Sequence, residues 1–63
     1  MDPNAAVAAL RDARQELQDA RAAGMSASVL RDLEEEFAER RQNLRDWKRS
    51  GGFAPDGGWP RNV

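Results

Sequence analysis

Carboxylate pairs are the residues of this 63-residue chain that come nearest to a metal-binding or acid–base arrangement. Asp32 with Glu36, and Glu35 with Glu39, lie four residues apart, so each pair would share one face of a helix. Helical carboxylate pairs bind di-metal centres where a Glu-x-x-His motif accompanies them, but the chain has no histidine. We therefore expect a solvated acidic helix face and no metal site.

Nucleophilic catalysis lacks its usual side chains. The sequence contains no Cys, His, Thr or Tyr, and its serines, Ser26, Ser28 and Ser50, fall where helix caps are expected. Gly51-Gly52 and Gly57-Gly58 precede no helical pattern, so neither resembles a phosphate-binding loop. We expect no catalytic residue, no cofactor and no enzymatic activity.

A basic patch is the strongest sign of a nucleic-acid partner. It consists of Arg40, Arg41, Arg45, Lys48 and Arg49, and it surrounds Trp47. Basic side chains beside an aromatic ring can hold phosphates and stack a base. The net charge of −1 provides no overall attraction to nucleic acid or to an anionic membrane. The same cations also suit the negative end of a helix dipole, which favours a solvated helix end; nucleic-acid binding stays an alternative.

Two helices must position these groups. Apolar residues at helical spacing predict a helix over about residues 27–49 and are Leu30, Leu33, Phe37, Leu44 and Trp47. A seam of alternating small and large residues predicts a helix over about residues 3–23 and consists of Ala6, Leu10, Ala13, Leu17 and Ala20.

Short-range signals place the helix ends. Asp2 and Pro3 suit the cap and the first position of the first helix, and Gly24 suits a left-handed stop. Ser26 is expected to cap the second helix, with Met25 packing on Leu30. A connection this short predicts an antiparallel hairpin over residues 1–50, in which large residues of one helix oppose small ones of the other.

One layer of this hairpin is irregular. Arg40 occupies an apolar position of the second helix, between Phe37 and Leu44. We expect Leu10 to fill that layer and Arg40 to extend outward to solvent.

Residues 51–63 are rich in Gly and Pro, and this composition predicts an irregular C-terminal tail. Trp47, the following Gly51-Gly52 and the later prolines have a layout that resembles the Trp-cage miniprotein. This resemblance implies that Pro55 or Pro60 covers Trp47. The candidate partner-binding residues are Trp47, Phe53, Pro55, Trp59 and Pro60. The tail is therefore either a binding arm or the end of the core, and both interpretations stay open.

The apolar core is small for an independent domain, and no cysteine is present to reinforce it. Reinforcement by self-association, by a protein partner or by the tail is expected. No apolar run approaches the roughly 18 residues of a membrane span, so we expect no membrane association and a cytoplasmic location, or a virion if the chain is phage-encoded.

Two resemblances carry further expectations. The opening Met1-Asp2-Pro3-Asn4-Ala5 and the later Leu44-x-x-Trp47-x-x-x-Gly51-Gly52-Phe53-x-Pro55 followed by Trp59 resemble small proteins of actinobacteria and their bacteriophages, for which no activity is known. Lys48 and Ala54 stand where that group has leucines. In length and architecture alone the chain also resembles Rop-type hairpins, which dimerise into four-helix bundles and bind RNA.

The sequence thus predicts an all-α helical hairpin with a Gly/Pro/aromatic tail. Two such hairpins could dimerise into a four-helix bundle. We expect the chain to be a small non-enzymatic protein–protein interaction module, which a phage could encode. The alternatives are a structural component of a phage particle and a Rop-like nucleic-acid binder.

Overall fold

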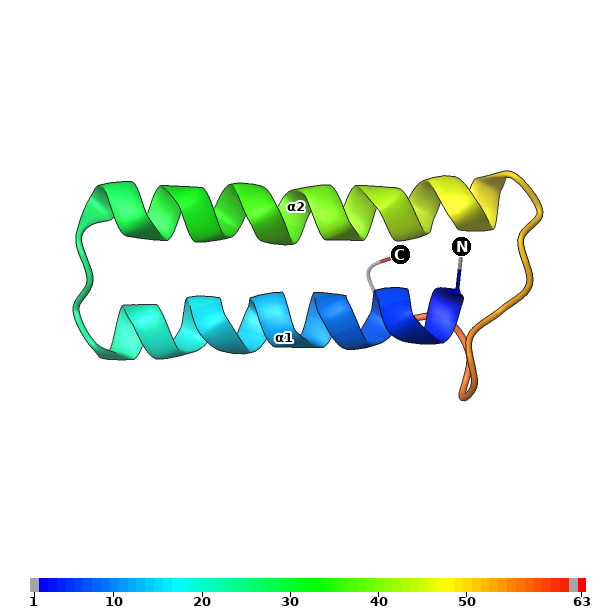
Figure 1. Ribbon diagram of the computed structural model, residues 1–63, viewed down its shortest axis with the longest axis horizontal. Coiled ribbons are helices and arrows are strands. Elements are labelled where there is room, and N and C mark those ends of the chain that lie inside the picture. The colour runs from blue at the N-terminus through cyan, green and yellow to red at the C-terminus, as the bar shows by residue number, and fades with distance from the viewer. Residues whose placement is uncertain (1, 62) are drawn as a thin grey trace.

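The computed structural model describes residues 2–61 and 63, so Met1 of the opening motif lies outside the described residues. Within them the chain forms two helices and no strand: α1 spans Pro3–Ala22 and α2 spans Ala27–Arg49. The helices lie antiparallel and packed together, and the C-terminal segment turns back toward the start of α1 (Figure 1). The predicted all-α hairpin is confirmed.

Asp2 and Gly24 begin and end α1 as the sequence predicts. The Asp2 carboxylate accepts hydrogen bonds from the backbone N–H groups of Asn4 (2.9 Å) and Ala5 (3.4 Å), which have no partner within the helix. Gly24 has a φ of +69°, and the Met25 N–H reaches back to the Ala20 carbonyl at 3.1 Å. This pair of features is a Schellman motif, which reverses the chain between the helices.

Ser26 occupies the cap position of α2, but its hydroxyl does not cap the helix. Its Oγ lies 3.2 Å from Oγ of Ser28, and it makes no hydrogen bond to a backbone amide of the first turn. Met25 remains 47% exposed, so its packing on Leu30 is at most partial. The two serine hydroxyls share one hydrogen bond instead, so the predicted side-chain cap is wrong.

The core is unevenly divided between the helices. Buried apolar residues of α1 follow the predicted seam, with Val7 in place of Ala6: Val7, Leu10, Ala13, Leu17 and Ala20. On α2 only Leu44 is fully buried, whereas Leu30, Leu33 and Phe37 are half-buried. The seam of α1 is thus buried, whereas the larger apolar side chains of α2, apart from Leu44, keep part of their surface exposed.

A second Schellman motif ends α2 and directs the tail. Gly51 has a φ of +85°, and the Gly52 N–H donates to the Trp47 carbonyl at 2.9 Å. The Ser50 hydroxyl donates to the same carbonyl at 2.9 Å. The Gly-Gly stop therefore sets the direction in which residues 53–63 leave the helix.

The tail packs on the open end of the hairpin. Trp59 and Val63 pack against the cluster formed by Val7, Leu10 and Leu44, and Pro55 is buried. Hydrogen bonds between the described residues help to hold it there. The Asp56 N–H donates to Oδ1 of Asn4 at 2.7 Å, and Nζ of Lys48 donates to the Val63 carbonyl at 3.1 Å. The tail thus completes the core at this end.

Candidate protein-binding pocket

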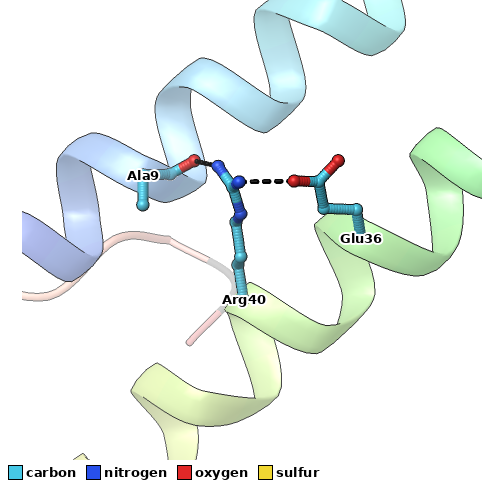
Figure 2. Close-up of polar contacts among 3 residues, drawn as sticks. All are labelled: Ala9, Glu36 and Arg40. Carbon is cyan, nitrogen blue, oxygen red and sulfur yellow. Dashed lines mark hydrogen bonds and ion pairs between the residues drawn. The ribbon is translucent and has the colours of Figure 1, made fainter.

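Arg40, one member of the predicted basic patch, is engaged between the two helices. Arg40 extends from α2 to α1, where its Nη1 donates to the Ala9 carbonyl at 2.8 Å (Figure 2). Its Nη2 forms an ion pair with Glu36, one turn earlier on α2. The expectation that Arg40 extends outward to solvent is wrong. Its half-buried guanidinium instead bridges the two helices.

The other members of the patch divide into two groups. The guanidinium of Arg41 lies over the ring of Phe37, 5.7 Å from the ring centroid. Arg45, Lys48 and Arg49 line a separate hollow together with Val63. Lys48 also lies 5.7 Å from the centroid of the Trp59 ring. Arg40, Arg41 and Lys48 thus each make a contact within the protein, to Ala9 and Glu36, to Phe37 and to Trp59, respectively.

The aromatic candidates also separate into two sites. Trp47 donates from Nε1 to the Phe53 carbonyl at 3.0 Å, and the two rings meet edge to face with centroids 5.5 Å apart. Gly52 lies directly against the indole of Trp47. Phe53 is 63% exposed. Pro60 lies elsewhere, lining a pocket with Trp59.

That pocket is a concave surface to which both helices and the tail contribute. It has a volume of about 310 Å³ and lies between α1, α2 and the returning tail. Its apolar lining comes from all three segments and consists of Val7, Leu10, Phe37, Trp59, Pro60 and Val63. Pockets that combine an apolar lining with a few charged groups are typical binding sites.

Four arginines belong to the lining of the same pocket. They are Arg11 and Arg14 of α1, Arg41 of α2 and Arg61 of the tail, and we call them the arginine rim. Among residues 2–61 and 63, no carboxylate forms an ion pair with a member of the rim. Asp56 is the acidic residue among those that line the pocket. The pocket thus combines apolar side chains with several positive charges.

Sequence reasoning identified Arg41, Trp59 and Pro60 but missed Arg11, Arg14 and Arg61. Arg11 and Arg14 lie three residues apart, beside Leu10 of the seam, so their place on one flank of α1 could have been read from helical spacing. Arg61 gave no such signal, because its position depends on how the irregular tail folds back.

Other kinds of site find little support in the described residues. Across residues 2–61 and 63, no three His, Cys, Asp or Glu side chains are grouped so that they could hold a metal ion. Neither α1 nor α2 is long and apolar enough to cross a membrane. The pocket is therefore the feature from which a function can be argued.

Comparison with known proteins adds no relative. No family model, no curated protein and no solved structure matches the chain. The resemblances to actinobacterial and phage proteins and to Rop-type hairpins accordingly stay expectations, and the function is argued from the pocket geometry.

Proposed function

We propose that this chain is a small non-enzymatic module that binds a protein partner, and that the pocket at the open end of the hairpin is its binding site. The observation that supports the proposal is the arrangement of this pocket. Half-buried apolar side chains, including Phe37 and Trp59, remain open to a ligand after the tail has folded onto the hairpin. Partly exposed aromatic and arginine side chains are the types that contribute most to protein interfaces.

Binding of a protein is favoured over binding of nucleic acid by the state of the aromatic rings. A base stacks on a free ring face, but Arg41 lies over Phe37 and Lys48 lies over Trp59. One face of each ring is therefore already covered by a cation of the chain itself. The net charge of −1 also gives no long-range attraction to phosphates.

A setting in a phage particle is compatible with this function but is a separate proposal. It rests on the resemblance of the chain ends to phage proteins and on the small, partly uncovered core. Mass spectrometry of purified virions tests it, because a structural component must be present in the particle. Absence from the particle would leave the binding module and remove the structural role.

The two indole groups provide a direct test of the binding site. Trp59 lines the pocket, whereas Trp47 packs with Phe53 and lies outside the pocket lining. Titration of the ¹⁵N-labelled chain with short peptides that carry one Leu, Phe or Trp should shift the Trp59 indole signal and leave the Trp47 signal in place. Equal shifts of both signals, or a shift of Trp47 alone, would place binding elsewhere and contradict the proposal.

A further inference from the structure

We infer that the ligand of the pocket is an acidic segment of a partner protein, with carboxylates that flank one large apolar side chain. This inference rests on the proposed function and specifies the chemistry of the partner. Three observations support it: the positive charge of the arginine rim, the volume of the pocket, and the origin of the rim residues in α1, α2 and the tail.

The positive charge of the arginine rim favours a ligand that carries carboxylates beside its apolar side chain. Arg11, Arg14, Arg41 and Arg61 contribute four positive charges, against one carboxylate from Asp56 among the lining residues. The two ion pairs described for the hairpin, Arg21–Glu34 and Arg40–Glu36, lie outside this set. Unpaired cations around an apolar centre are complementary to carboxylates around an apolar side chain.

All four cations of the rim are arginines, and this further defines which acidic groups the ligand should carry. A guanidinium group presents a planar fork of N–H donors that matches the two oxygens of a carboxylate. The rim also draws on three separate segments of the chain. A ligand with more than one carboxylate could therefore contact arginines of different segments.

The volume of the pocket indicates the size of the apolar side chain that the ligand inserts, which we call the anchor. At about 310 Å³ the pocket is at the small end of the range for ligand sites, which begins at roughly 300 Å³. It suits one aromatic or branched aliphatic side chain better than a cofactor. Val7 and Leu10 of the lining are already buried, whereas Phe37 and Trp59 keep surface that an anchor can cover.

Two acidic residues of the chain, Glu34 and Glu36, are already engaged with Arg21 and Arg40, so a second copy would have to present other acidic residues to the pocket. A second copy in the pocket is therefore treated as an outcome of the test.

The test compares four fluorescent probes by anisotropy. The first is a ten-residue peptide with a central Leu flanked by Glu residues, the second replaces every Glu by Gln, and the third replaces the Leu by Ala. The fourth is a single-stranded RNA of equal charge. The inference predicts that the first probe binds at least about tenfold more tightly than the second and the third, a difference of about 1.4 kcal/mol.

Rim variants then locate the binding. Arg11→Gln, Arg14→Gln and Arg61→Gln should each weaken binding of the Glu probe about two- to fivefold, the range for exposed ion pairs. Arg31→Gln, an exposed arginine of α2 outside the pocket lining, is the matched control and should change nothing. Each variant is checked by thermal unfolding, and since these side chains are exposed, the melting temperature should be retained.

The other outcomes separate this inference from the proposed function. Equal binding of the Glu and Gln peptides would overturn the acidic ligand and keep the protein-binding pocket. No binding of any peptide would overturn both. Tighter binding of RNA would replace the protein partner by nucleic acid. Loss of a dimer in Arg14→Gln, seen by sedimentation equilibrium, would identify the ligand as a second copy and overturn the acidic partner segment.

Discussion

Gly52 lies so close to Trp47 that no side chain fits between them. A Cβ atom on Gly52 would be 2.1 Å from Cε2 and 2.5 Å from Nε1 of the indole. The ring is rigid, and it is held by the hydrogen bond from Nε1 to the Phe53 carbonyl and by the edge-to-face contact with the Phe53 ring. The Gly-Gly stop thus provides both the turn at the end of α2 and the space in which the indole packs.

Gly52→Ala is therefore expected to lower the free energy of unfolding by about 1–3 kcal/mol, the usual cost of overpacking. For a domain of this size, each kcal/mol corresponds to about 4–8 °C in the melting temperature. Thermal unfolding followed by circular dichroism measures the effect. In a Trp47→Ala background the same substitution should cost much less, because the ring that it meets is gone. An equal cost in both backgrounds would show that the indole is not the obstacle.

Arg40 is expected to stabilise the hairpin through its bridge between the helices. Arg40→Met keeps the aliphatic stem but removes the donors to the Ala9 carbonyl and to Glu36. We expect a loss of about 1–3 kcal/mol in the free energy of unfolding, the range for hydrogen bonds of a charged group. Denaturation by urea measures it. Arg31→Met is the control, and a loss as large as that of Arg40→Met would assign the effect to charge alone.

Trp59 and Phe53 should differ in their contribution to stability. Trp59 packs against the core, whereas Phe53 is 63% exposed. Trp59→Ala is expected to cost about 2 kcal/mol, less than the 3–5 kcal/mol of a fully buried aromatic residue. Phe53→Ala should cost about 1 kcal/mol, mainly through its ring contact with Trp47. If Trp59→Ala leaves the melting temperature unchanged, the tail is an arm rather than part of the core.

Asn4 is expected to hold the tail at the start of α1. Its Oδ1 accepts the Asp56 N–H at 2.7 Å, a contact that joins residues 52 positions apart. Asn4→Ala should accelerate hydrogen exchange at the Asp56 amide, since exchange follows local opening. Asn4→Asp keeps an acceptor at this position and should preserve most of the protection. Equal exchange in all three proteins would mean that this bond does not limit opening of the tail.

Self-association is expected from the uneven core. Val29, Leu30 and Leu33 stay half-buried in the single hairpin, and Met25 is 47% exposed. Covering this surface with a second copy would add apolar burial to a small core. Sedimentation equilibrium over a range of concentrations tests the expectation. A mass equal to that of one chain at every concentration would contradict it and leave the tail as the main reinforcement of the hairpin.

Local signals were enough to predict the hairpin, because each depends on residues within one or two turns. Asp2 and Pro3 start α1, Gly24 reverses the chain, and Gly51-Gly52 ends α2. The small-and-large seam of α1 likewise follows from helical periodicity. The exception is Ser26, whose hydroxyl had a neighbouring hydroxyl as a competing partner.

The candidate site depends instead on contacts between residues far apart in the sequence. The arginine rim combines α1, α2 and the tail, and no spacing rule relates Arg61 to Arg14. Which aromatic residue completes the core was also undecided until the tail was placed: Trp59 packs inward and Phe53 stays exposed. Periodicity assigned Arg40 to the apolar stripe but could not show that a carbonyl of the opposite helix would accept a hydrogen bond from its guanidinium group. Helix ends are local in origin, whereas a pocket exists only where separate segments meet.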